Sequence, residues 1–113
     1  MNADIYNENG ILFVNIDENF DIGSISNLKD QILESIETQK YNRIILDLTR
    51  VRFLDSTAIG IIIKIALNSK EKKARFALIN LDENIYKLFT MSNLQRVVQI
   101  FSDKKQAIQF MNE

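Results

Sequence analysis

Residues 43–60 read RIILDLTRVRFLDSTAIG, and this stretch decides the fold. Residues 43–48 are rich in branched apolar side chains, which is typical of a strand buried on both faces of a sheet. A short loop follows, and Asp55, Ser56 and Thr57 then open a stretch with helical spacing. A buried strand that leads through a loop into a helix is the repeating unit of α/β proteins. The stretch therefore predicts an α/β fold.

The sequence on either side continues the alternation of strands and helices. An Asn-Gly pair within residues 7–10 predicts a tight hairpin turn between two short strands. A helix follows, capped by Ser24 or Ser26, because apolar residues recur there at helical spacing. The other expected elements are strands at 4–6, 11–16, 43–48, 75–80 and (as a brief edge strand) 97–100, and helices at 55–69, 83–90 and 104–111. They predict one α/β domain over residues 1–113, with a mixed β-sheet of about four to five strands and about four helices.

Composition narrows the function classes. The chain has 113 residues, which suits one compact domain. It has no cysteine and no histidine, so disulfides and thiolate metal sites are excluded and the commonest general base is missing. A net charge of −1 lacks the excess of positive charge that is typical of nucleic-acid-binding proteins. The N-terminus lacks signal-peptide features, and the apolar residues 59–67 are too few to span a bilayer. We therefore expect a cytoplasmic protein with no cofactor, no metal, no direct nucleic-acid contact and no membrane insertion.

The hydroxyl pair Ser56 and Thr57 stands where the second helix begins. A helix N-terminus presents unpaired N–H groups and a partial positive charge, so it accommodates a phosphate. Phosphorylation there would add close to two negative charges beside Asp55 and change what docks on that surface. The alternative from local physics alone is that Asp55 or Ser56 simply caps the helix.

The same segment resembles the signature of the STAS family. Members carry a strand ending in Asp-Leu-Ser or Asp-Leu-Thr, then an apolar residue, Asp-Ser-Ser or Asp-Ser-Thr, and a glycine-containing helix start. The matching residues are Asp47, Leu48, Thr49, Leu54, Asp55, Ser56, Thr57, Ile59 and Gly60. The resemblance covers the whole chain, from residues 11–16 with Phe20 and Asp21 to the closing helix, strand and helix within 81–110. It implies a STAS domain of the bacterial anti-sigma-factor antagonist branch.

In that branch, the serine directly after the aspartate is phosphorylated by a partner serine kinase that is also the anti-sigma factor. The unmodified antagonist binds this kinase and releases the sigma factor, whereas the phosphorylated form does not bind. A PP2C-type phosphatase then resets the cycle. Carried over by position, the resemblance implies phosphorylation of Ser56, with Thr57 as a minor alternative. The protein is then a substrate and a ligand with no catalytic residue, and we expect a monomer.

The expected partner-binding surface surrounds this serine. It comprises Asp21, Asp55, Ser56, Thr57, Ala58, Gly60, Ile61, Lys64 and Ile65. Ile61 and Ile65 enter it on the hypothesis that one of them is partly exposed, and the alternative is a single wide buried face. Two residues depart from the family pattern: Ala58 and Asn93 stand where glycine is usual, and asparagine tolerates a positive φ. We expect most phenylalanines, Phe53 included, in or near the core.

Two other functions stay open from the sequence. In the first, the domain is a constitutive accessory subunit of a lipid-transport ABC complex or a scaffold of a stress-signalling assembly, and Ser56 is never modified. In the second, Ser56 is the nucleophile of a small hydrolase or transferase. That chemistry needs a nearby base, and without histidine only a lysine or a carboxylate could serve.

Overall fold

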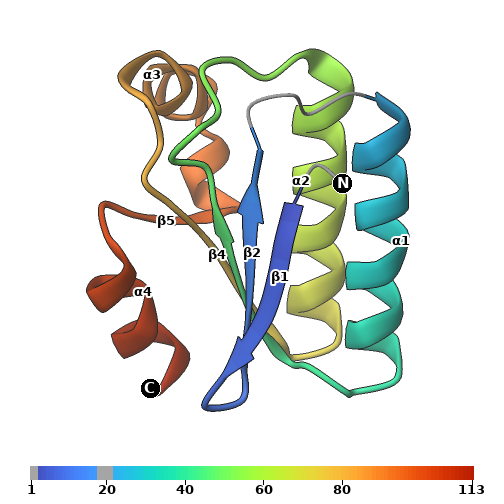
Figure 1. Cartoon of the computed structure of the whole chain (residues 1–113). Coiled ribbons are helices and arrows are strands. Elements are labelled where there is room, and N and C mark those ends of the chain that lie inside the picture. Colours follow the sequence, from blue (N-terminus) through green and yellow to red (C-terminus); the bar gives the residue numbers. More distant parts are fainter. Residues whose placement is uncertain (1–2, 18–21) are drawn as a thin grey trace.

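The computed structural model of the protein describes residues 3–17 and 22–113. These residues form five strands and four α-helices, which alternate after an initial hairpin (Figure 1). The elements in order are β1 (Ala3–Glu8), β2 (Ile11–Ile16), α1 (Ile22–Glu37), β3 (Arg43–Asp47), α2 (Ser56–Glu71), β4 (Arg75–Ile79), α3 (Glu83–Met91), the 3₁₀ helix η1 (Leu94–Arg96), β5 (Gln99–Phe101) and α4 (Lys104–Met111). The predicted α/β class is confirmed.

The strands form one mixed sheet in the order β1-β2-β3-β4-β5. β1 and β2 pair antiparallel through the hairpin, and each later pair of neighbours is parallel. In the hairpin turn, Asn9 and Gly10 have φ angles of 54° and 80°, the left-handed conformation that an Asn-Gly pair favours. Parallel neighbours need crossover connections, and α1, α2 and α3 supply them. The carboxyl ends of β2 to β5 therefore lie at one edge of the sheet, where the loops to the helices begin.

Helices cover both faces of the sheet, because side chains alternate between the faces along each strand. On one face, Val14 and Ile44 belong to a buried cluster shared with α1, α2 and α3. On the other face, Phe13 and Ile45 pack with α4. Figure 1 shows α1 and α2 side by side on one side of the sheet and α4 on the other. The side of α2 that faces the sheet is therefore buried in the core.

Most element boundaries differ by one or two residues from the sequence-based prediction, and two of the differences have a clear physical reason. α1 begins at Ile22, so Ser24 and Ser26 lie inside the helix and neither is its cap. Helical spacing of apolar residues marks a buried face but not the first turn, which explains an error of this size. The last strand spans Gln99–Phe101, two residues later than expected, because Val98 is fully buried beside the turn of η1 instead of pairing in the sheet. Asn93, which opens that turn, has a φ of 58°, as expected of an asparagine in a glycine-like position.

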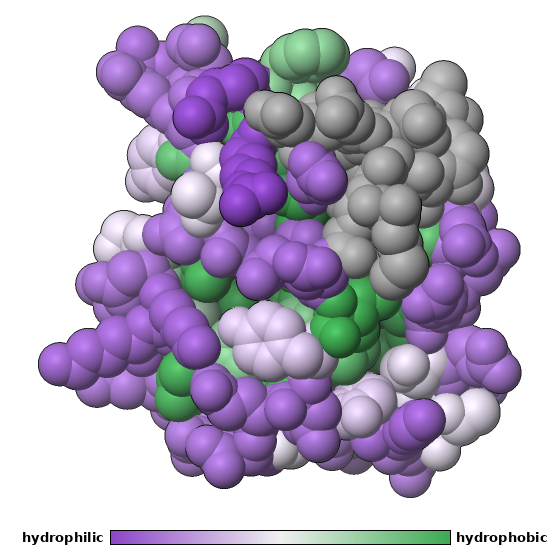
Figure 2. Space-filling model, in the orientation of Figure 1, coloured by the Kyte–Doolittle hydropathy of each residue, from purple (hydrophilic) through white to green (hydrophobic). Residues whose placement is uncertain are grey.

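The edge strand β1 lies at the front of the molecule in Figure 1. In the same orientation, hydrophilic residues cover most of the described surface, and apolar side chains are visible only between them (Figure 2). Asp4 and Glu8 are among the exposed residues of this strand. Charged side chains on an edge strand oppose the addition of another strand. In the described part of the chain, no helix combines the length and the hydrophobicity that crossing a membrane requires.

Candidate functional site

Asp55 is the N-cap of α2. Its backbone is extended (φ −82°, ψ 175°), and its Oδ1 accepts a hydrogen bond of 2.8 Å from the backbone N–H of Ala58. Its carbonyl oxygen accepts the first helical bond, from the N–H of Ile59 at 3.0 Å. This geometry satisfies one of the donors that a helix start leaves unpaired. Of the two capping residues that the sequence left open, Asp55 is therefore the one that caps.

Ser56 is the first residue of α2 and is exposed, as is Thr57. Within residues 3–17 and 22–113, nothing forms a hydrogen bond with the Ser56 hydroxyl. Because Asp55 performs the capping, this hydroxyl has no structural task in the helix. It lies at the positive end of the α2 dipole, open to another molecule.

Buried side chains and hydrogen bonds hold the loop that joins β3 to α2 and leads to Ser56. Leu48 and Val51 are buried, and the Leu48 N–H donates a hydrogen bond of 3.1 Å to the carbonyl of Ile79 at the end of β4. Arg52 Nη1 donates a bond of 2.9 Å to the carbonyl of Thr49. The loop therefore enters α2 from a fixed point at the carboxyl edge of the sheet.

Asp47 organises the start of this loop. Its Oδ1 accepts hydrogen bonds from the backbone N–H of Thr49 (3.0 Å), from the Thr49 hydroxyl and from Asn80 Nδ2 (3.2 Å). The STAS-like pair Asp47 and Thr49 thus has a structural role. It closes the turn that leaves β3.

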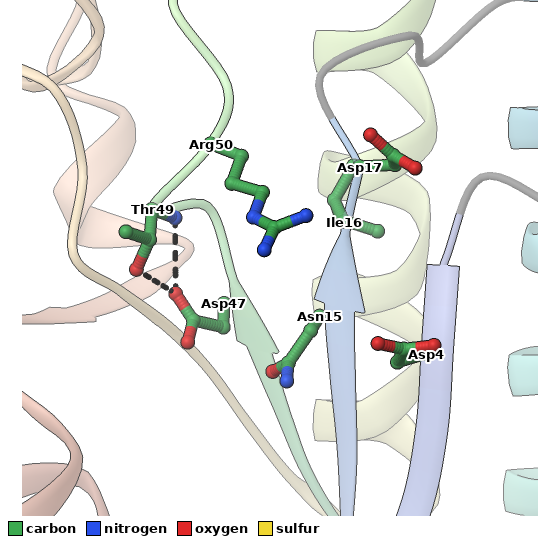
Figure 3. A pocket seen from close by; sticks show the side chains of 7 residues that line it. All are labelled: Asp4, Asn15, Ile16, Asp17, Asp47, Thr49 and Arg50. Atoms are coloured by element: carbon green, nitrogen blue, oxygen red, sulfur yellow. Dashed lines mark hydrogen bonds between the residues drawn. The ribbon is translucent and has the colours of Figure 1, made fainter.

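A polar pocket of about 260 Å³ opens beside Asp47, at the carboxyl ends of β2 and β3. It is lined by Asp4, Asn15, Ile16, Asp17, Asp47, Thr49 and Arg50. Figure 3 shows the Arg50 guanidinium between the Asp47 side and the Asp17 side of this pocket. In the described ranges, no three carboxylates come close enough together to hold a metal ion.

The predicted site residues on α2 differ in how exposed they are. Ser56, Gly60, Lys64 and Leu67 are exposed and follow one another at intervals of three or four residues, so they form one stripe. We call these four residues the outer stripe of α2. Ile61, beside the stripe, is partly buried. Asp21, which was also predicted to border the surface, lies outside the described residues.

Two residues of the predicted partner-binding surface are buried instead. Ala58 is 6% exposed and Ile65 is 2% exposed, and Ile65 belongs to the core cluster between the sheet and α2. Both side chains are therefore buried, and of the two isoleucines expected to include a partly exposed one, Ile61 is that residue and Ile65 is not. The reason is that α1 and β4 pack against this side of α2 and select its inner face.

Two exposed apolar residues on α2 or in the loop before it were missed by the sequence analysis. Phe53, expected in or near the core, is 81% exposed in the loop just before Asp55. Leu67 is 51% exposed in the outer stripe. For Leu67 a signal existed, because it lies seven residues after Gly60 and therefore two turns along the same side of the helix. For Phe53 none existed, since loop residues carry no periodicity.

Comparison with known proteins assigns the family. Residues 2–107 match the family model of the STAS domain. The chain belongs to the STAS domain family. The resemblance seen in the Asp47–Gly60 segment is thereby confirmed.

Three proteins of known name or structure are similar to this chain. The anti-sigma F factor antagonist of Paenibacillus polymyxa is 24% identical over 99 residues, which cover 88% of this chain and 85% of that protein. The crystal structure of a candidate anti-sigma factor antagonist from Thermotoga maritima aligns with a TM-score of 0.87 at 21% identity, covering 98% of this chain and 95% of the other. The phosphorylated form of the Bacillus cell fate determinant SpoIIAA aligns with a TM-score of 0.77 at 18% identity, covering 95% and 96%. At such identities the structural matches establish the fold.

Proposed function

We propose that this STAS domain is an anti-sigma-factor antagonist, and that phosphorylation of Ser56 switches its binding to an anti-sigma-factor serine kinase. The relatives that it resembles include named anti-sigma-factor antagonists, among them the Paenibacillus polymyxa protein. The observation that carries the proposal is the state of Ser56, whose hydroxyl is exposed and makes no hydrogen bond with the described residues while Asp55 caps the helix. A hydroxyl with no structural task, held at a fixed helix start, is suited to modification.

In the unmodified state the kinase docks on the outer stripe of α2 and positions its ATP over Ser56. The Ser56 oxygen attacks the γ-phosphorus of ATP and forms a new O–P bond. The bond between the γ-phosphorus and the oxygen that bridges it to the β-phosphate breaks. ADP leaves, and the serine proton passes to a base of the kinase. The phosphatase reverses the modification by transferring the phosphoryl group to water.

The phosphorylated state disfavours docking through charge and volume. Phosphorylation adds close to two negative charges at Ser56, directly beside the Asp55 carboxylate. The outer stripe otherwise carries a single charge, that of Lys64, and the apolar Leu67. A surface that was nearly neutral becomes strongly anionic at one end, so a partner matched to the neutral form loses affinity by repulsion and by desolvation of the phosphate.

In this function the protein is a substrate and a ligand rather than a catalyst. Ser56 as a nucleophile would need a base within hydrogen-bond reach, and its hydroxyl has no such partner among the described residues. Thr57 is exposed next to Ser56 and is the minor acceptor in the proposal. A kinase, a PP2C-type phosphatase and a sigma factor act together in the cytoplasm, which is where we place the protein, as a monomer.

Intact-mass measurement tests the proposal. The wild type, Ser56→Ala and Thr57→Ala are incubated with ATP and a lysate of the source bacterium. We expect a gain of one phosphoryl group in the wild type and in Thr57→Ala, and none in Ser56→Ala. If the wild type gains no mass while a control substrate is phosphorylated in the same lysate, the switch is wrong. The constitutive accessory or scaffold role would then replace it.

A further inference from the structure

Two of the chain's glycines have described surroundings, and the fold explains one of them. Gly10 has a φ of 80°, and a Cβ built on it would lie 2.5 Å from Arg43 Nη2. Arg43 cannot simply move away, because its guanidinium bonds the Asn9 carbonyl and the Asn112 side chain, each at 2.8 Å. A side chain at position 10 is therefore excluded by both backbone conformation and space.

Gly60 has no comparable explanation. It lies inside α2, is exposed, and is absent from the positive-φ residues of the described chain. A Cβ built on it meets no heavy atom within 4 Å. Glycine within a helix is less favourable than alanine, because its backbone loses more conformational freedom on folding. Within the described structure, glycine at position 60 thus lowers stability without relieving any clash.

The position of Gly60 connects it to the proposed switch. It lies one helical turn after Ser56 and one turn before Lys64, in the middle of the outer stripe. Leu67 continues the same side of the helix and leaves half of its surface exposed. On the opposite side, Ile62 and Ile65 are buried. The missing side chain therefore faces away from the protein's own core, next to an exposed apolar residue.

We infer that Gly60 is the point of closest approach between α2 and the serine kinase, and that its missing side chain sets the distance from the kinase to Ser56. The inference rests on the proposed function. Without a Cβ, the kinase backbone packs directly against the main chain of α2, and the Ser56 hydroxyl one turn away comes within reach of ATP. Phosphoryl transfer needs close positioning, and a displacement of about 1 Å can reduce a rate by about a hundredfold.

Substitution of Gly60 separates this role from a structural one. We expect Gly60→Ala to raise the Tm by about 4 °C, because alanine favours the helix. In the lysate assay with ATP, we expect the rate of Ser56 phosphorylation to fall by about tenfold in Gly60→Ala and further in Gly60→Gln, since each added atom holds the kinase farther away. Gln109→Ala, at an exposed position of α4, is the matched control and should be phosphorylated at the wild-type rate.

Three results would overturn the inference. Wild-type phosphorylation of Gly60→Ala and Gly60→Gln would remove Gly60 from the contact while leaving the proposed function intact. A lower Tm in Gly60→Ala would mean that the fold itself requires the glycine. Absence of phosphorylation in the wild type would defeat the proposed function, and the inference with it.

Discussion

The side-chain amide of Asn80 donates a hydrogen bond of 3.2 Å to Asp47, so the residue that follows β4 holds the residue that ends β3. The same carboxylate oxygen accepts two bonds from Thr49. These contacts fix the direction in which the chain leaves the sheet. The loop that starts here leads to Ser56 at the start of α2, so the position of this helix start depends on Asp47.

Replacement of Asp47 by alanine should therefore weaken the fold. We expect Asp47→Ala to lower the free energy of unfolding by about 1–3 kcal/mol, because the Thr49 and Asn80 donors lose their acceptor. Urea denaturation measures the change. Asp30→Ala is the control, because among the described residues the exposed Asp30 side chain contributes a surface ion pair with Lys29. Its effect should stay within about 0.5 kcal/mol. Equal midpoints for the two variants would contradict the role of Asp47.

A second prediction follows because Asp55 caps α2 and Ser56 does not. Asp55→Ala removes the helix cap and should cost about 1 kcal/mol, whereas Asp55→Asn should retain most of the stability. Ser56→Ala should change stability by no more than about 0.5 kcal/mol, since its hydroxyl makes no hydrogen bond with the described residues. The three variants are compared by urea denaturation. A cost for Ser56→Ala as large as that for Asp55→Ala would show that the serine has a structural task after all.

The fold was largely predictable because its strongest signals are local. The run at 43–48 is apolar enough to require burial on both faces, and an Asn-Gly pair specifies a hairpin almost alone. The exposed face of α2 was not predictable. Its residues Ile59, Ile61, Ile62, Ile63 and Ile65 surround much of the helix, so periodicity leaves the buried side ambiguous. Packing against α1 and the sheet resolves it, and that information is tertiary.

Lys104 leads to a prediction of how the stability of the fold depends on pH. A hydrogen bond with Glu8 is the main cause that raises the pKa of Lys104 above its ordinary value, and the nearby Tyr6 contributes. The ammonium group lies 3.1 Å from Glu8 Oε2 and 4.5 Å from the centroid of the Phe13 ring. A pKa raised by folding stabilises the protein fully below the unfolded-state value of about 10.4, and the gain is lost as the pH rises through the folded value.

We therefore expect Glu8→Gln to lower stability by about 0.5 kcal/mol near neutral pH, a small effect because both side chains are partly exposed. The difference from the wild type should vanish at a pH above the folded-state pKa of Lys104. Urea denaturation of both proteins over a pH series measures it. The control is the same Glu8→Gln substitution made in a Lys104→Met variant. There it should have no effect on stability at any pH. A difference that persists at the highest pH would assign the stabilisation to something other than the ion pair.

The last prediction concerns two apolar residues that are close in sequence but lie on opposite sides of α2. Ile65 is buried against the sheet, so Ile65→Ala should lower the free energy of unfolding by about 2–5 kcal/mol. Leu67 is half exposed in the outer stripe, so Leu67→Ala should change stability by less than about 1 kcal/mol. In the lysate assay, however, we expect Leu67→Ala to be phosphorylated at Ser56 more slowly than the wild type, because in the proposed function the kinase buries this side chain when it docks.

Leu88 provides the matched control, since it is an exposed leucine on α3 and lies outside the outer stripe. Leu88→Ala should be phosphorylated at the wild-type rate. Equal slowing in the two leucine variants would indicate a general loss of surface hydrophobicity instead of a docking contact. No slowing in Leu67→Ala would confine the kinase contact to the first turns of α2, around Ser56 and Gly60. A selective loss in Leu67→Ala, with its fold intact, would extend the docking surface three turns along the helix from the switch.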